Sequence, residues 1–299
     1  MRRMLVLGCS VFLVGCIDRM ILDGTLKSTR DASKAFDTLT DLEVAKLGAG
    51  SSLVQLEGMQ QLAPDNEDAL FLLTQSWAGY GAAFIEDEWE QAVDRGDDDQ
   101  EVAQATRARE AYERSIRFGT LLMEIRHPGF FAATRNTETL RAYLKPLGKE
   151  EAANLLWLGI AWLSRGGVVS ERSDIDAELF VAEELLEKSV QLDPTLAYAT
   201  GLSALAAYHA RSPDAELKQS KELFEKSLSM TARKALSVQV LYAQSFACNS
   251  HDATLYRQLL DEVIAAPDDV LPEQRLENVI AKRKAKRYLG TPRLKRCGF

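Results

Sequence analysis

The chain has 299 residues, of which 36 are lysine or arginine and 44 are aspartate or glutamate, so its formal net charge is −8. This negative charge argues against general nucleic-acid binding, which needs basic surfaces facing the phosphates. Two of the four cysteines lie within the first sixteen residues, and the two that remain make no disulfide framework. The length suits one or two ordinary domains, and no linker separates two.

The first sixteen residues have the pattern of an export signal. Arg2 and Arg3 precede an uncharged, mostly apolar run from Met4 to Leu13, which leads into the string LVGC ending at Cys16. This run is shorter than the roughly 20 apolar residues that a membrane span needs. LVGC resembles a bacterial lipobox, in which Cys16 is acylated and becomes the mature N-terminus. We predict a lipoprotein signal peptide over residues 1–15; the alternative is a plain signal peptide with an incidental cysteine.

A lipidated tether is expected over residues 16–30. Removal of Arg2 and Arg3 changes the formal charge from −8 to −10, which suits a periplasmic body. Ile17, rather than aspartate, follows the acylated cysteine, and by the enteric sorting rule this favours the outer membrane. Cys248 and Cys297 also remain in the chain after removal of the signal peptide. In an oxidising compartment they could form a disulfide; the alternative is a small buried residue and a cysteine in a loose tail.

One spacing recurs along the body of the chain: a residue, a large residue four later, a third residue three later and a proline five beyond that. The copies with proline are Ser52, Leu56, Met59, Pro64, then Ala182, Leu186, Ser189, Pro194, then Leu255, Leu259, Glu262, Pro267; those without it are Ala108, Tyr112, Ser115 and Ser220, Phe224, Ser227. Offsets of four and three place the helical residues on one face, and proline ends the helix. This pattern is typical of the second helix of a tetratricopeptide-type unit.

The matching first helix is also present. The string LWLGIAW contains Leu155, Leu158, Gly159 and Trp162, in which the small residue allows close approach of a partner helix. Leu70, Leu73, Thr74 and Trp77 follow Pro64 with the same spacing. We therefore predict an all-α fold over residues 31–289, a tetratricopeptide-like helical repeat (an α-solenoid of antiparallel helix pairs). A generic helical bundle is the alternative.

The expected elements follow in chain order. A helix over 33–62 is interrupted near 48–52; helix pairs then cover 66–87 with 101–120, 151–165 with 176–191, 196–210 with 215–229, and 235–248 with 252–265. A last helix starts near Pro272, a residue that suits the first turn, and runs to residue 289, followed by a basic C-terminal tail over 290–299. No alternation of apolar and polar residues is long enough to predict a strand.

Long turns are expected at 88–100, 127–148 and 165–176, and such turns on a helical repeat often gather on a binding rim. The first lies within an acidic stretch from Glu86 to Glu101, which we interpret either as a solvated turn or as a dock for a basic partner surface. The opposite bias occurs from Lys282 to Arg296, with eight basic residues and no acids. Complementing a helix dipole explains part of this bias, and contact with an anionic membrane surface is the alternative.

The sequence contains no catalytic pattern. The histidines are His127, His209 and His251, and none has a second metal ligand at three or four residues' spacing, although Asp252 adjoins His251. Zinc-protease, Cys-x-x-Cys, nucleophile-elbow and phosphate-loop motifs are all missing. We expect no enzyme, no metal site and no cofactor.

Aromatic side chains mark a candidate ligand site. Trp77, Tyr80 and Phe84 share one helical face. Further candidates follow on later units: Trp157, Trp162, Tyr198, Tyr208 and Tyr242. Glycines nearby leave room beside the rings. These residues either fill the core between helices or line an apolar groove or pore for a small solute.

Several segments together resemble the T-component lipoproteins of TRAP (tripartite ATP-independent periplasmic) transporters. They are SWAGYGAAFIEDE, RAREAYERSIRFG, LWLGIAWL, LEKSVQLDP and, most closely, LYAQSFA with the run LYRQLLDEVIAAPDDVLPEQRLENVIAKRKAKRYL, ordered between residues 30 and 289. The resemblance implies a lipid-anchored helical-repeat protein that works with a periplasmic solute-binding protein. It also implies a homo-oligomer, expected as a trimer, and a path for a small hydrophobic solute.

The resulting hypothesis is a non-enzymatic accessory lipoprotein of a TRAP-type uptake system, attached to the membrane through its lipid alone. The alternative is a tetratricopeptide-type scaffold lipoprotein that assembles an envelope complex. A pore lined by aromatic side chains would favour the first hypothesis, and a groove lined by asparagine and lysine would favour peptide binding by a scaffold.

Overall fold

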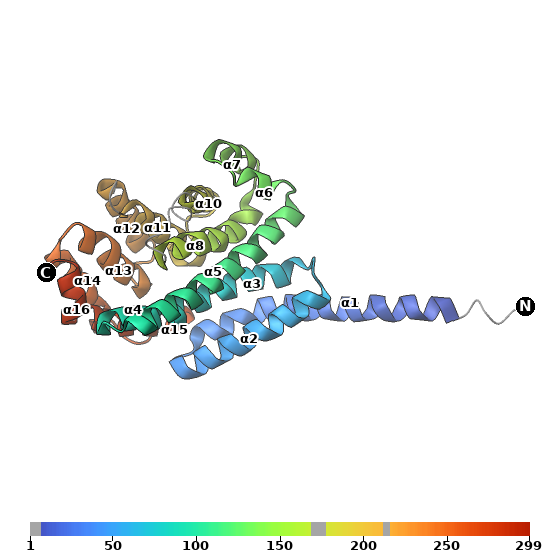
Figure 1. Ribbon diagram of the computed structural model, residues 1–299, viewed down its shortest axis with the longest axis horizontal. Coiled ribbons are helices and arrows are strands. Elements are labelled where there is room, and N and C mark those ends of the chain that lie inside the picture. The colour runs from blue at the N-terminus through green and yellow to red at the C-terminus, as the bar shows by residue number, and fades with distance from the viewer. Residues whose placement is uncertain (1–6, 169–177, 212–215) are drawn as a thin grey trace, which may run out of the picture.

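The computed structural model describes residues 7–168, 178–211 and 216–299, with side chains from residue 19 onward. This part of the chain contains helices and no strand, which confirms the all-α prediction (Figure 1). The helices are α1 (Leu7–Ala32), α2 (Leu42–Leu62), α3 (Glu67–Tyr80), α4 (Glu86–Arg95), α5 (Asp98–Arg126), α6 (Phe130–Ala133), α7 (Thr137–Leu144), α8 (Ala152–Val168), α10 (Leu179–Leu192), α11 (Leu196–His209), α12 (Leu217–Met230), α13 (Leu236–Tyr242), α14 (Ala253–Ala265), α15 (Arg275–Tyr288) and α16 (Thr291–Arg296). Short 3-10 turns are η1 (Ser33–Thr38), η3 (Lys149–Glu151) and η5 (Pro272–Gln274), and π-helical turns are η2 (Gly81–Ile85) and η4 (Ala243–Ala247).

The helices pack as successive pairs, as the repeat spacing predicts. Helix α3 packs on α5, α8 on α10, α11 on α12 and α13 on α14. Each pair also touches the next through α5 and α8, α10 and α11, and α11 and α13. The pairs therefore form a curved stack, and Figure 1 shows α15 and α16 brought back beside α4.

The third residue of the repeated spacing has a common role in three copies. Ser115 Oγ donates to the carbonyl of Thr74 at 2.6 Å, Ser189 Oγ to that of Ala152 at 2.7 Å, and Ser227 Oγ to that of Ala199 at 3.2 Å. In every case the bond runs from the second helix of a pair to the backbone of the first. The serine at this position is small enough for the two helices to approach closely, and its hydroxyl forms a hydrogen bond between them.

Glycine in the first helix allows the close approach that the sequence indicates. A Cβ built on Gly159 of α8 would lie 2.9 Å from Cγ of Leu186 in α10, closer than carbon atoms pack. The flanking Leu155 and Leu158 are fully buried, and so is Leu186. The helix pair α8–α10 therefore depends on a residue without a side chain at position 159.

The segment expected as a tether, residues 16–30, lies within helix α1. Leu26 is fully buried in a cluster with residues of α2, α3 and α5. Arg19 Nη2 pairs with Asp65 at 2.6 Å, and Arg30 Nη1 pairs with Asp68 at 2.7 Å. These contacts explain why the second half of α1 is part of the body, while Figure 1 shows its first half projecting from it.

The expected break near residues 48–52 does not occur, because α2 runs unbroken from Leu42 to Leu62. Glycine costs roughly 1 kcal/mol in a helix relative to alanine, which favours a break without requiring one. The side chain of Asp41 caps the helix by accepting from the amides of Glu43 and Val44. Burial of Leu53 and Leu56 then holds the helix against the body.

The turn expected at 88–100 is much shorter than predicted. Helix α3, the π turn η2 and α4 continue into one another, and the chain reverses only at Gly96, whose φ of +66° favours glycine. Asp97 then caps α5 by accepting from the amide of Gln100. Most of the acidic stretch is therefore helical. Of the turn expected at 165–176, residues 169–176 lie outside the described residues, and α8 extends to Val168.

The C-terminal tail is folded. Cys248 and Cys297 form a disulfide, which attaches the end of α16 to the end of the helix that contains α13. Arg293 of α16 is buried, and Phe299 packs against Tyr256 with ring centroids 5.2 Å apart. Residues 290–299 therefore belong to the last layer of the fold, which corrects the expectation of a loose basic tail.

Candidate functional site

Three of the predicted aromatic residues form one row beneath α2. The rings of Trp77 and Tyr80 lie 6.5 Å apart at 89°, and those of Tyr80 and Phe84 lie 5.5 Å apart. Trp77 Nε1 donates to Glu57 Oε1 at 2.9 Å, and the guanidinium of Arg114 lies over its ring. The shared helical face predicted from the spacing is therefore present, and its polar edge is occupied by residues of α2 and α5.

At Phe84 the row borders a small cleft. Phe84 lines a space of about 70 Å³ together with Leu42, Ala83, Ile280 and the charged residues Glu43, Lys46, Asp87, Glu88 and Arg283. Small-molecule sites usually enclose about 300–1,000 Å³, so this cleft is much smaller than a typical solute site. Phe84 also packs against Ala45 and Leu276. The observed surroundings of this row are those of packed side chains, and solute binding stays a prediction.

The remaining candidates do not join this row into one lined path. Trp157 is half-buried in the same cluster as Trp77, whereas Trp162 is buried in the next cluster along the stack. Tyr242 stacks on Phe224 with centroids 4.5 Å apart, and Tyr198 packs at the edge of the same C-terminal cluster. The Tyr208 hydroxyl donates to Glu183 at 2.9 Å. These five remaining candidates are thus divided among three core clusters and one polar contact.

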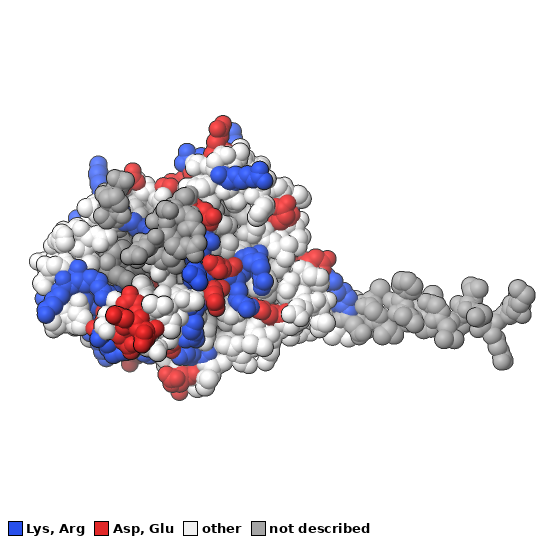
Figure 2. Space-filling view, in the orientation of Figure 1, with Lys and Arg blue, Asp and Glu red and all other residues white. Residues whose placement is uncertain are grey.

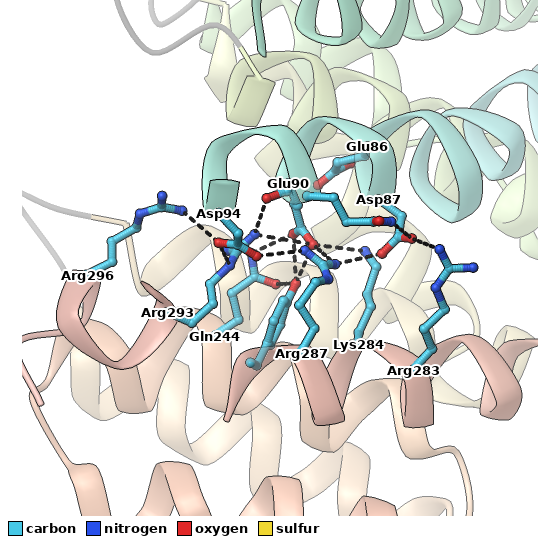
Figure 3. A network of polar contacts seen from close by, with 12 residues as sticks. Glu86, Asp87, Glu90, Asp94, Gln244, Arg283, Lys284, Arg287, Arg293 and Arg296 are labelled. Carbon is cyan, nitrogen blue, oxygen red and sulfur yellow. Dashed lines mark hydrogen bonds and ion pairs between the residues drawn. The ribbon is translucent and has the colours of Figure 1, made fainter. Parts of the chain in front are cut away.

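A second candidate site is a group of opposite charges whose three acids are buried. We call it the acid–base cluster; its members are Asp87, Glu90 and Asp94 of α4, Gln244 of η4, and Arg283, Lys284, Arg287, Tyr288, Arg293 and Arg296 from α15 and α16. Arg287 contacts all three acids, at 2.6 Å from Asp87, 2.5 Å from Glu90 and 3.2 Å from Asp94 (Figure 3).

Glu90 occupies the centre of the acid–base cluster. Its carboxylate accepts from the Tyr288 hydroxyl at 2.7 Å, and that hydroxyl lies 2.8 Å from Gln244 Oε1. Burial alone would raise the pKa of Glu90, but the charges of Lys284, Arg293 and Arg287 and the bond from Tyr288 lower it to about 2. Glu90 is therefore ionised at neutral pH although its side chain is almost fully enclosed.

Glu86 shows the opposite behaviour one turn earlier. The Tyr112 hydroxyl donates to Glu86 Oε2 at 2.5 Å, and burial raises the pKa of the Glu86 carboxyl despite the nearby charge of Lys284. Tyr112 also explains the glycine of the π turn, because a Cβ on Gly81 would lie 2.9 Å from its ring. The π turn η2 contains Phe84 of the aromatic row and leads directly into the acidic helix α4.

The acid–base cluster corrects the sequence interpretation of both charged segments. The acidic stretch is neither a solvated turn nor free for a partner at these positions, and the basic segment does more than complement a helix dipole. The acidic and basic segments contact each other within the same chain. Arg287 and Asp87 are 200 residues apart in the sequence, and Arg293 and Glu90 are 203 residues apart. The two opposite charge biases were a usable signal for this pairing; nothing in the sequence pointed to Tyr288 or Gln244.

The acid–base cluster joins the first helix pair to the end of the chain. Its charged groups contact one another, and none of the described residues forms a group of three or more metal-binding side chains. The arrangement holds these charges in fixed positions between α4 and the helices α15 and α16. The role of the acid–base cluster is therefore structural.

Comparison with protein families agrees with this architecture. The model of the TRAP transporter T-component family matches residues 38–292, which is nearly all of the folded body. The chain belongs to the TRAP transporter T-component family. A search of curated proteins finds no match.

Membership makes this protein an accessory component of a TRAP transporter, and it associates the protein with transport parts of the cell envelope. The family is one of accessory transport components and is not a known enzyme family. Among the helices formed by the described residues, none combines the length and apolarity needed to cross a bilayer.

Proposed function

We propose that this protein is the lipid-anchored, periplasmic T-component of a TRAP-type uptake system, in which it holds a solute-binding protein close to the membrane. The observation that carries the proposal is the family match over residues 38–292, which spans the helix pairs and the acid–base cluster. Catalysis has no part in this role. The protein works as a homo-oligomer and contacts the membrane through its acyl chains alone.

The anchor is Cys16, acylated after removal of residues 1–15. Cys16 lies within α1, ten residues before Leu26, whose side chain is fully buried in the body. At 1.5 Å per helical residue, the anchor lies about 15 Å from that buried position. A T-component held this way keeps its folded body next to the membrane surface, on the periplasmic side and, because Ile17 follows Cys16, at the outer membrane.

Replacing Cys16 by serine tests the anchor. Cells fed a radiolabelled or clickable palmitate are expected to label the wild-type protein and leave the Cys16→Ser variant unlabelled, unprocessed or released from the membrane. Cys9, which leaves with the signal peptide, supplies the matched control, since Cys9→Ser is expected to label normally. Labelling and membrane attachment of Cys16→Ser would overturn the anchor.

The solute-binding protein is the proposed partner, and a small hydrophobic solute is the proposed cargo. Affinity capture of the full-length lipoprotein from its own envelope is expected to retain a TRAP-type solute-binding protein. Trp77, Tyr80 and Phe84 are the proposed contacts for a solute. Loss of solute binding in Tyr80→Ala, with little loss of stability, would support that role. A loss of several kcal/mol in both Tyr80→Ala and Phe84→Ala would assign the rings to the core.

A further inference from the structure

An open groove of about 690 Å³ lies against one face of α15. Four cations of that helix line it, namely Lys282, Arg283, Lys286 and Arg287. Asp268, in the loop that follows α14, is the only carboxylate among the described residues that line it. The volume falls within the range of about 300–1,000 Å³ that is usual for small-molecule sites. We call this space the α15 groove.

The four cations of the α15 groove repeat at helical spacing. Lys282 and Lys286 are four residues apart, as are Arg283 and Arg287, and Arg283 and Lys286 are three apart. Residues three or four apart are neighbours on a helix surface, and like charges at this spacing destabilise the helix. A bound anion reduces this repulsion, so the groove has a physical reason to attract one.

Two of these cations are already engaged within the chain. Lys282 Nζ donates to the carbonyl of Ala266 and pairs with Asp268, both at 2.5 Å. Arg287 contacts the three acids of the acid–base cluster. Each of the two side chains is 17% exposed, so most of it is held against the body.

The other two cations have donors to spare. The Arg283 side chain is 49% exposed and lies at the edge of the acid–base cluster, 3.4 Å from Asp87 (Figure 3). Lys286 is exposed and forms no ion pair with any described residue. A guanidinium matches two oxygens of one carboxylate or phosphate, and an ammonium binds an oxygen as a point charge. Arg283 and Lys286 together can therefore pair with two acid groups.

Positive charge exceeds negative charge around the α15 groove, although the whole chain has a net charge of −8. Figure 2 shows side chains of both signs next to one another where α4 lies. The groove and the acid–base cluster together contain seven cations and four carboxylates, which are Lys282, Arg283, Lys284, Lys286, Arg287, Arg293 and Arg296 with Asp87, Glu90, Asp94 and Asp268. This local surplus attracts anions, whereas the rest of the chain repels them.

We propose that the α15 groove binds a small anion with two or more carboxylate or phosphate groups. One acid group pairs with the Arg283 guanidinium and another with the Lys286 ammonium, while Val279 offers apolar surface to the body of the ligand. Lipid headgroups are not the expected source, because the projecting half of α1, which carries the proposed anchor, leaves the body on the side away from α15 (Figure 1). The proposal does not rest on the solute-binding partner or on the aromatic row.

Titration calorimetry of the detergent-solubilised full-length protein at physiological ionic strength tests the site. Citrate and pyrophosphate are the probes, and at least one is expected to bind with a Kd of about 1 mM or tighter. Arg283→Gln with Lys286→Gln is expected to weaken binding about 100-fold, since each change removes a charge-assisted bond worth about tenfold. The melting temperature should not change, because both side chains are exposed.

Lys218→Gln with Lys221→Gln is the matched control. These lysines are exposed on α12, three residues apart like Arg283 and Lys286, and they lie outside the α15 groove. The control removes the same charge and is expected to bind the probes as the wild type does. Acetate, which has one acid group, is expected to bind at least about tenfold more weakly than citrate or pyrophosphate.

The relative affinity of the two probes identifies the acid group. Tighter binding of citrate would assign the site to carboxylates, and tighter binding of pyrophosphate would assign it to phosphates; either supports the proposal. A wild type that binds neither probe would overturn it. Equal weakening in the two double variants would also overturn it, because binding would then follow net charge rather than the α15 groove. Acetate binding as tight as that of the better probe would overturn the recognition of two acid groups.

Discussion

At the scale of single residues, Arg287 and Glu90 decide how the end of the chain is held. Arg287 is the only base of the acid–base cluster for which contacts to Asp87, Glu90 and Asp94 are all within 3.2 Å. Glu90 is nearly fully enclosed and depends on three cations for its charge. Buried ion pairs add little net stability as a whole, but removing one partner leaves an uncompensated charge. The effect of a substitution therefore depends on burial and on the number of partners.

Replacing Arg287 by glutamine is expected to cost about 3 kcal/mol of unfolding free energy, because Asp87 and Glu90 lose their shared cation. Arg296→Gln is the matched control. Its side chain is 46% exposed and 3.8 Å from Asp94, so about 0–1 kcal/mol is expected. Urea unfolding followed by circular dichroism measures both. Equal losses in the two variants would show that burial of the acid–base cluster does not set its energetics.

Low pH is expected to weaken the contacts of Glu90 in the acid–base cluster. The pKa of Glu90 is lowered in the folded protein to about 2 from an ordinary value near 4.5, so the unfolded chain binds the proton more readily. Its contribution is fully present above about pH 4.5 and is lost as the pH falls toward 2. The stability difference between wild type and Glu90→Gln is therefore expected to narrow between pH 7 and pH 3.5. A constant difference over this range would contradict the assignment.

At the scale of helices, the repeat pattern predicted which helices pack together, but it did not predict where the turns lie. Proline and the four–three spacing identify where second helices lie and end, so the partners α3–α5 and α8–α10 followed from the sequence. The helix predicted over 66–87 covers α3 and the π turn η2, but its extension through residues 88–95 of α4 was not predicted, because polar residues of this kind occur both in turns and on exposed helices. Contacts with α5 and, some 200 residues away, with α15 favour the helix.

The serine at the third repeat position is expected to contribute similarly in separate pairs. Ser115→Ala and Ser189→Ala each remove a buried bond to a backbone carbonyl and are expected to cost about 1 kcal/mol. The two losses should add in the double variant, because the sites share no partner. Ser28→Ala on the exposed face of α1 is expected to change stability by less than about 0.5 kcal/mol. A loss at only one of the two buried sites would contradict a shared role.

The disulfide is expected to stabilise the last layer of helices. It closes a loop across 49 residues, and a loop of that length corresponds to about 4 kcal/mol in the chain-entropy account. Adding a reductant should lower the urea midpoint of the wild type. The midpoint of the double variant Cys248→Ser with Cys297→Ser should not change. If reduction has no effect on wild type, the bond does not restrain the C-terminal segment.

At the scale of the whole molecule, the chain is a stack of helix pairs whose two distant parts meet at the acid–base cluster. The sequence predicted the all-α architecture and the family, because helix periodicity and the ordered segments are local signals. It did not predict the joining of α4 to α15 and α16, which depends on the curvature accumulated over several pairs. The aromatic candidates were recognisable as a class, but their division among core clusters was set by packing that no local pattern encodes.

Native mass spectrometry of the protein taken from its own cell envelope tests the central claim most directly, since one spectrum reports both the anchor and the partner. The account predicts a chain that begins at Cys16, carries the added mass of acyl chains, and is bound to a TRAP-type solute-binding protein. A chain that keeps residues 1–15 or lacks acyl mass, and that is captured without such a protein, would contradict it.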